Sequence, residues 1–574
     1  MAAHYSSHSH PTCFLLLMIV CSSFQWMLGQ AALEFQAFRL LQYQASGEMF
    51  GSWRSALNGM AHRIGTGRSI NGSLSRELMR KIVVLRLAEL THQFLEEFLD
   101  QVQASGLVIL LPPPDQVTAE QVMEFKVIEQ FLVRQQIPMA VYFVYETPEL
   151  LALYDELPAS EGGGRAAGPQ HTNWLKDQIQ LVAKLGEATP IKPLEGENLY
   201  GFLHGQSNVT RSTWQTNLPT IAIVASYDAF GGAPSLAMGA DGNGSGLIAA
   251  LELARLFRKL YDTLKQGPYN LLFLLTSGSV SNFRGSDFWL SKSDARTLDL
   301  IEIAICLDSI GDGEGLRLHV SRQPKDEKVK KFVERMRAVA ERMKIDFDLK
   351  TKKIKINDPV VPWQHEQFAR YKVASGTLSH VREPAPIFIR SSLFDQDFSD
   401  AARARLMHRI RFVAETLALH IYGIDDTDIE VFEGTLSVNE DYIRSWQRLL
   451  STTPRFYPLL KPKSPFMLQL EEALGGYLKE VQRQAFIAPS EVNTYYTDFP
   501  VSIKAHRTKP VWFDFLYLVL NLIYLMGLYV VLKGPKNIDW AKLLDVSSLP
   551  KNLPSLGGTG SGGKTAGSKK SKHA

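Results

Sequence analysis

Side chains that could bind a metal ion follow apolar runs in the middle of this 574-residue chain. Asp228 comes soon after an apolar run at 220–225, Asp308 comes directly after a second run at 301–307, and His380 lies further along. Short apolar runs of this kind indicate buried strands. Carboxylate and imidazole groups are common zinc ligands, so Asp308 and His380 are candidate ligands of a metal centre, and Asp228 lies at the neighbouring strand end.

The segments between these residues add a recognisable frame. The loop GADGNGSG at 239–246 opens an apolar-periodic helix at 247–257, and TSGSVSNFRGSDFW at 276–289 follows the next strand at 269–275. This frame resembles the active site of M28-type zinc aminopeptidases. In that family a His-x-Asp strand end, a bridging Asp in the loop and a Glu-Glu pair supply ligands and the general base. The matching positions here are Ser226, Gly242, Ser279 and Val280.

These substitutions remove the chemistry that the frame implies. A serine hydroxyl is a poor neutral zinc ligand, and glycine has no side chain. Only Asp308 and His380 match family ligands, and two of five ligands without a base cannot hold a dinuclear centre. We expect no enzyme activity, no cofactor, and hydrogen bonds from backbone amides to Asp228 and Asp308. A residual single-metal site is the alternative.

Composition excludes one large class of function. The net charge is only +3, and no basic groove motif interleaved with aromatic residues appears, so no nucleic-acid contact is expected. A chain of this length is too long for one core and predicts two or three folded units.

Both ends of the chain carry apolar segments. Residues 13–21 have the length of a signal-peptide core, which predicts a signal peptide at 1–30, with a short signal anchor as the alternative. Residues 511–532 are long and apolar enough to predict a transmembrane helix. A cleaved signal would place the body in the lumen and the basic tail at 533–574 in the cytosol.

Other short signals agree with this topology. Asn-x-Ser/Thr sequons, the acceptors of N-linked glycans, all precede the predicted span and lie at Asn71, Asn208 and Asn243. Lys570 and Lys572 fit the spacing of a dilysine retrieval signal, although a solvated basic tail is the simpler alternative. Cys306 is the only cysteine outside the predicted signal peptide, so no intrachain disulfide is possible, and its strand predicts a buried thiol.

The lumenal body is predicted to be α/β. Strand-like runs alternate with helical patterns at 31–188, which predicts a smaller N-terminal α/β lobe ending in a helix at 174–187. Residues 189–424 predict the M28 zinc-aminopeptidase-like domain, a mixed, largely parallel sheet flanked by helices. Residues 425–510 are predicted to be a helical membrane-proximal segment, with helices at 442–450 and 467–486.

Taken with the degenerate site, the signal peptide and the span, this arrangement resembles the nicastrin-like family. EFQAFRLLQY, VASYDAFG, GADGNGSG and CLDSIG carry the resemblance. It implies an endoplasmic reticulum membrane protein that is a non-catalytic scaffold, with a link to Nodal signalling. The implied partners are the Nodal modulator protein, transmembrane protein 147, and the Sec translocon with the ribosome-associated machinery that inserts multi-pass proteins.

Two alternatives remain open from the sequence. One is a nicastrin-type substrate-recognition subunit of a membrane protease, and the other is a residual metallopeptidase. Within the predicted span, Asp514 and Asn521 are seven residues apart and lie on nearly the same helix face. An amide facing lipid lacks partners, so this face is predicted to pack against a partner's transmembrane helix.

Overall fold

The computed structural model describes residues 33–65, 70, 72–159, 178–206, 218–263, 266–355, 357–358, 360–488, 493–508 and 511–533. The described residues up to Thr508 form one compact unit, the body, and the C-terminal helix belongs to a second unit. The predictions for residues 1–30 and 534–574, and for Asn71 and Asn208, concern residues outside the described ones.

The larger part of the body is built on an 8-stranded sheet in the order β15-β14-β16-β13-β11-β12-β10-β17. Its centre is parallel, because β11 pairs in parallel with both β12 and β13, whereas the edge strand β17 is antiparallel to β10. The strands are β10 (Leu194–Leu203), β11 (Thr220–Ser226), β12 (Asn270–Thr276), β13 (Ile301–Leu307), β14 (Leu316–Val320), β15 (Phe347–Thr351), β16 (Ser375–Ser379) and β17 (Val481–Ala488). The predicted mixed, largely parallel sheet is confirmed.

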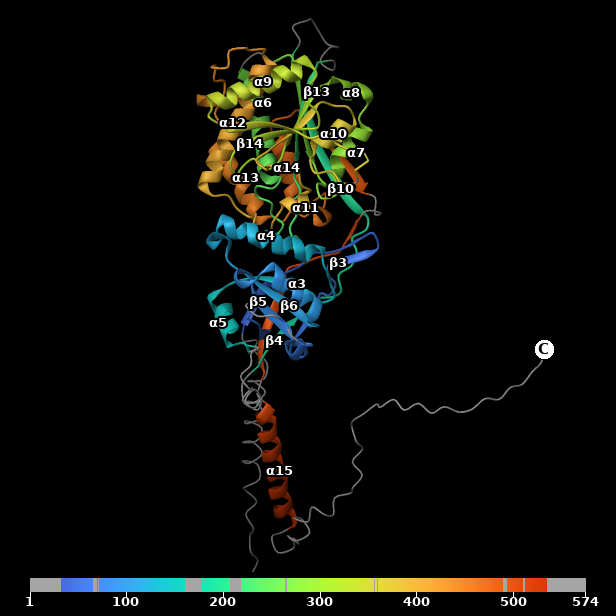
Figure 1. Cartoon of the computed structure of the whole chain (residues 1–574), viewed down its shortest axis with the longest axis vertical. Helices are drawn as coiled ribbons and strands as arrows, with labels where there is room; N and C mark the ends of the chain where they lie inside the picture. The colour runs from blue at the N-terminus through green and yellow to red at the C-terminus, as the bar shows by residue number, and fades with distance from the viewer. Residues whose placement is uncertain are drawn as a thin grey trace, which may run out of the picture. The chain divides into compact units, whose positions relative to one another are not determined.

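Helices cover both faces of this sheet (Figure 1). The body's helices from residue 244 onward are α6 (Gly244–Thr263), α7 (Arg284–Lys292), α8 (Ala295–Leu300), α9 (Glu327–Arg342), α10 (His365–Arg370), α11 (Ile387–Arg390), α12 (Asp400–Ile421), α13 (Glu440–Thr452) and α14 (Pro465–Gly475). Strand β11 shows why two layers are needed. Ile221, Ile223 and Ala225 join one apolar cluster, and Ala222 and Val224 join another on the opposite face. Successive side chains of a strand point to opposite faces, so a strand that is apolar throughout must be covered twice.

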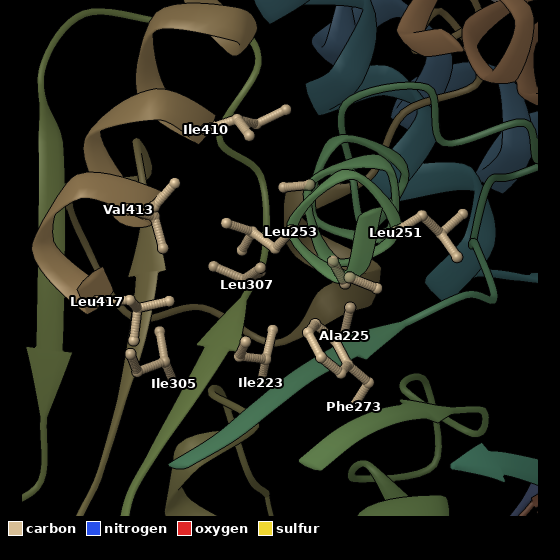
Figure 2. Close-up of a cluster of buried hydrophobic side chains, with 14 of the residues drawn as sticks. Ile223, Ala225, Leu251, Leu253, Phe273, Ile305, Leu307, Ile410, Val413 and Leu417 are labelled. Carbon is tan, nitrogen blue, oxygen red and sulfur yellow. The ribbon is translucent and has the colours of Figure 1, made fainter. Parts of the chain in front are cut away.

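The first of these clusters is the main core of the body. Figure 2 shows Leu253 of α6 and Val413 of α12 packed above Ile223 and Ile305 of the sheet, and all four side chains are buried. Full burial of an aliphatic side chain stabilises a protein by about 1.5–3 kcal/mol. The layer therefore fixes α6, whose first turn begins at the degenerate loop. Cys306 is fully buried on the other face of the sheet, which confirms the predicted buried thiol, and this burial raises the pKa of the thiol.

The smaller part of the body contains a closed barrel, β1-β19-β9-β4-β5-β6-β8. The strands are β1 (Leu33–Arg39), β4 (Leu57–Arg63), β5 (Ile82–Arg86), β6 (Gly106–Leu111), β8 (Ala140–Tyr145), β9 (Gln178–Ala183) and β19 (Val501–Thr508). A separate 4-stranded sheet has the order β18-β2-β3-β7. It is formed by β2 (Gln42–Ala45), β3 (Glu48–Ser52), β7 (Gln136–Ile137) and β18 (Asn493–Tyr495). The helices here are α2 (Gly72–Leu78), α3 (His92–Gln101), α4 (Ala119–Arg134) and α5 (Pro148–Glu156).

Two sequence predictions about secondary structure are wrong. Residues 178–183, expected in a helix, form β9, whose burial alternates between half-buried and buried positions with the period of two that a strand requires. Residues 425–508 are not a helical segment throughout. Helix α14 ends at Gly475, β17 joins the large sheet, and β19 closes the barrel by pairing with β1 and β9. The segment from β17 to β19 thus connects both parts of the body.

The second unit contains helix α15 (Val511–Lys533), which confirms a helix at the predicted position. Large apolar side chains along it, such as Phe515 and Leu532, are exposed. Among the residues that the structure describes, no helix has the length and apolar character needed to cross a membrane.

Candidate functional site

The degenerate site lies where three neighbouring parallel strands end. Strands β11, β12 and β13 run in the same direction and are hydrogen-bonded in the order β13-β11-β12. Asp228, Ser279 and Asp308 follow these strands and so lie at one edge of the sheet, where open α/β sheets commonly bind ligands. The resemblance to the M28 frame predicted this placement.

Asp228 is held by Ser279, one of the two residues at the positions of the family's Glu-Glu pair. Its Oδ2 accepts hydrogen bonds from the Ser279 backbone N–H at 2.9 Å and from Ser279 Oγ at 2.7 Å. The side chain is fully buried, and burial raises its pKa to about 6 despite those hydrogen bonds. The predicted hydrogen bond from a backbone amide is present. Asp228 and Ser279 therefore hold the loops after β11 and β12 together.

Asn243 completes this contact from the start of α6. Its Nδ2 donates to the Asp228 carbonyl oxygen at 2.9 Å and lies 3.2 Å from Ser279 Oγ, and the residue is only 1% exposed. Its φ of 64° lies in the left-handed region, which asparagine tolerates better than most residues. Nδ2 is the atom that would carry a glycan. The expectation of a glycan at Asn243 therefore does not fit the folded chain.

Gly242 stands where the family has its bridging aspartate, and the carboxylate of Asp395, from another loop, lies beside it. Asp395 accepts hydrogen bonds from the backbone N–H groups of Asp241 at 2.8 Å and Gly242 at 2.7 Å. A Cβ atom built on Gly242 would lie 2.9 Å from Asp395 Oδ2. Burial, with the nearby charge of Asp241, raises the pKa of Asp395 to about 6. The Asp395 carboxylate therefore occupies the space that a side chain at position 242 would need.

Asp308, the residue that matches a family ligand, is paired with a cation. Its Oδ2 lies 2.5 Å from Arg390 Nη1 and accepts a hydrogen bond from Ser379 Oγ at 3.0 Å. Both charged side chains are only 6% exposed, and the Arg390 guanidinium lies 4.6 Å from the centre of the Trp363 ring. The contact predicted for Asp308 was a backbone amide, and the side-chain partners found instead are a guanidinium and a hydroxyl.

His380, the other residue that matches a family ligand, also contacts other protein groups. Its Nδ1 lies 3.0 Å from the Ser309 carbonyl oxygen and 3.3 Å from Asp241 Oδ2. Among the described residues, no group of three or more His, Cys, Asp or Glu side chains is arranged to hold a metal ion.

The last two degenerate positions lie in packed surroundings. Ser226 Oγ is buried 3.5 Å from Thr276 Oγ1, and Val280 packs against an apolar cluster. Together with the Arg390 pair on Asp308, these residues do not fit a dinuclear zinc centre.

Arg455 is a central residue of this site that sequence reasoning missed. It is fully buried, and its guanidinium donates to the carbonyl oxygens of Tyr227 at 2.5 Å, Met238 at 2.7 Å and Gly239 at 2.5 Å. Burial lowers its pKa to about 10, which the charges of Asp228 and Asp395 partly oppose. A cation from the loop between α13 and α14 thus holds the loop after β11.

Asn521 is one of the two α15 residues predicted to face a partner's transmembrane helix. Asn521 is exposed, and its Nδ2 donates to the Tyr517 carbonyl oxygen at 3.0 Å, one turn earlier in the same helix. The Asn521 amide therefore has a hydrogen-bond acceptor within its own helix. It does not need another protein's helix to pair it, which removes one reason for the predicted packing of this face. The side chain of Asp514 lies outside the described residues.

Comparison with known proteins agrees with this frame. The model of Peptidase family M28 matches residues 208–385. "BOS complex subunit ncln" of Danio rerio is 31% identical over 91% of this chain and 93% of its own length. "BOS complex subunit NCLN" of Mus musculus is 32% identical over 85% and 87%, and "Nicalin" of Caenorhabditis elegans is 24% identical over 88% and 91%.

A solved structure shares the fold. The "gamma-secretase component Nicastrin" superposes with a TM-score of 0.54 at 10% identity and covers 83% of this chain and 100% of its own. At this identity the likeness shows the fold alone.

Proposed function

We propose that this chain, which belongs to the family of the BOS complex subunits NCLN and nicalin, is a non-catalytic scaffold subunit of such a complex. The observation that carries the proposal is the Arg390 guanidinium on Asp308. The carboxylate that matches a metal ligand already has a cationic partner, and both side chains are buried.

The finer role is a further part of the proposal. The complex would associate with the Sec translocon and assist the insertion of multi-pass membrane proteins, with the Nodal modulator protein and transmembrane protein 147 as partners and a link to Nodal signalling. The family resemblance supports these roles. Affinity purification of the full chain in mild detergent tests them. Recovery of both partners is expected, whereas recovery of an intramembrane protease would favour a substrate-recognition subunit instead.

The location is proposed on separate grounds. We propose an endoplasmic reticulum membrane protein with a cleaved signal peptide, a lumenal body and a cytosolic tail. The long apolar run at 511–532 and the exposed apolar side chains of α15 support membrane contact. Extraction of microsomes with alkaline carbonate tests whether the chain is embedded in the membrane. A chain that stays in the pellet has a segment embedded in the bilayer, and a chain that is released does not.

The glycans and the tail test the orientation. Asn71 and Asn208 should carry glycans, and protease added outside sealed microsomes should remove only the tail. Changing Lys570 and Lys572 to Ser should let some chain acquire complex glycans. If the glycans stay unchanged, partners rather than the tail hold the chain in place. Digestion of the body by the added protease would show that the body, not the tail, faces the cytosol.

A further inference from the structure

A pocket of about 490 Å³ lies at the edge of the large sheet that is opposite the degenerate site. The beginnings of β13 and β16, the end of β14 with the loop after it, and parts of α9 and α10 line the pocket. Strands β13 and β16 run parallel, and Asp308 and His380 follow their other ends. The 5 residues of β16 span roughly 16 Å at about 3.3 Å per residue. The pocket is therefore separate from the degenerate site.

The walls of the pocket are mainly apolar. Four half-buried side chains face it from the loops and from α10: Pro324, Ile354, Ala369 and Ala374. Buried side chains of β14 and α9 lie behind them, among them Leu318, Val320, Val329 and Val333, and these belong to the main apolar cluster of the body. Small-molecule sites usually enclose about 300–1,000 Å³ and are lined mostly by apolar side chains. The size and the lining both fit a small ligand with an apolar body.

The charges around the pocket are unbalanced. Four cationic side chains line it: Arg322, Lys325, Arg370 and Lys372. None of the four forms an ion pair with another described residue, although Arg370 Nη2 donates to the Asp358 carbonyl oxygen at 3.1 Å. Asp326 is the only carboxylate among the described residues that line the pocket. Its Oδ1 already accepts hydrogen bonds from the backbone N–H groups of Lys328 at 2.8 Å and Val329 at 3.4 Å, at the start of α9.

These two features together define the ligand. We propose that the pocket binds a small amphiphilic anion, with its apolar body against the walls and its carboxylate or phosphate head group among the four cations. An uncharged apolar molecule would leave the cations without a counter-charge, and a small inorganic anion would leave the apolar walls in water. Unpaired cations beside an apolar surface attract an anion that carries its own apolar part. The proposal does not depend on the proposed function.

The experiment uses the full chain in a neutral detergent, with a photoreactive decanoate that carries a diazirine near its methyl end. Mass spectrometry then identifies the labelled peptides. Labelling should saturate as the probe concentration rises, and it should fall on the lining segments at 324–333 and 369–376. Unlabelled decanoate and decyl phosphate should both compete, and the stronger competitor identifies the head group. Decanol, which is uncharged, should compete about tenfold more weakly or less, and acetate should not compete.

Charge variants test the contribution of the cations. Arg322→Gln/Lys325→Gln removes two of the four charges and should raise the probe concentration for half-maximal labelling about tenfold. The matched control, Lys331→Gln/Arg337→Gln, removes the same charge from exposed positions of α9 that do not line the pocket, and it should have no effect. The neutral micelle takes up the probe equally in every variant, so the ratio between variants reports the pocket. Ala369→Phe should reduce labelling by filling part of the pocket.

The thermal midpoint shows that a variant with weaker labelling is still folded. Arg322 and Lys325 are exposed, so replacing them should leave the midpoint unchanged even if Ala369→Phe lowers it. The proposal is overturned if labelling at 324–333 and 369–376 does not saturate, or if decanol competes as well as decanoate. It is also overturned if the folded Arg322→Gln/Lys325→Gln variant is labelled like the wild type.

Discussion

Replacing Arg390 should destabilise the body far more than replacing an exposed cation. The Arg390–Asp308 pair is 2.5 Å long with both side chains 6% exposed, so Arg390→Met leaves a buried carboxylate without its cation. Breaking a buried pair by removing one partner costs about 3–5 kcal/mol. Unfolding entropy for a body of this size is about 1 kcal/mol/K, so the apparent Tm should fall by about 3–5 °C.

The matched control is Lys350→Met. Lys350 and Asp348 are 2.7 Å apart, but their side chains are 51% and 52% exposed. Exposed pairs contribute about 0–1 kcal/mol, so this variant should shift the Tm by 1 °C or less. The double variant Arg390→Met/Asp308→Leu should recover much of the loss, because neither charge is then buried alone. Thermal unfolding of the full chain in detergent, followed by tryptophan fluorescence, measures all of these. An Arg390→Met variant as stable as Lys350→Met would refute the reasoning.

Three further predictions follow from the site. Gly242→Asp should lower the Tm by several degrees rather than restore a ligand, because its Cβ would lie 2.9 Å from Asp395 Oδ2; an unchanged Tm would show that the loop yields freely. Asn243→Gln should leave the glycan pattern after endoglycosidase digestion unchanged, because Nδ2 is buried; loss of one glycan would show that modification precedes folding. The pKa of Asp228 is raised to about 6 from 3.8, so protonation favours the folded state, and stability should fall as pH rises from about 4 through 6. Asp228→Asn should flatten that decline in a pH series of Tm values, and an unchanged slope would assign the decline to other groups.

The sequence located the frame because its signals are local. The apolar runs before Asp228 and Asp308 and the glycine-rich start of α6 each occupy one short segment, and strand–loop–helix order then places them at one sheet edge. The substitutions at Ser226 and Gly242 were found because these local segments resemble the M28 motif, position by position.

The residues that now fill the site could not be found in that way. Arg390 lies 82 residues from Asp308, Asp395 lies 153 residues from Gly242, and Arg455 lies 228 residues from Tyr227. Nothing in a single sequence distinguishes a buried arginine from a surface one, because burial is set by tertiary packing. For the same reason β17 was mistaken for part of a helix: its partner, β10, is remote in the chain.

An ion-paired polar core stands where the family has a metal site, and the zinc content of the full-length protein tests this replacement most directly. The protein would be purified without chelator, equilibrated with excess zinc, desalted, and measured by plasma mass spectrometry. Well below one zinc ion per chain is expected, because Asp308 is paired with Arg390 and the other ligand positions hold Ser226, Gly242, Ser279 and Val280. Two zinc ions per chain that are retained by wild type and lost in Asp308→Ala would show that the metal site has not been replaced.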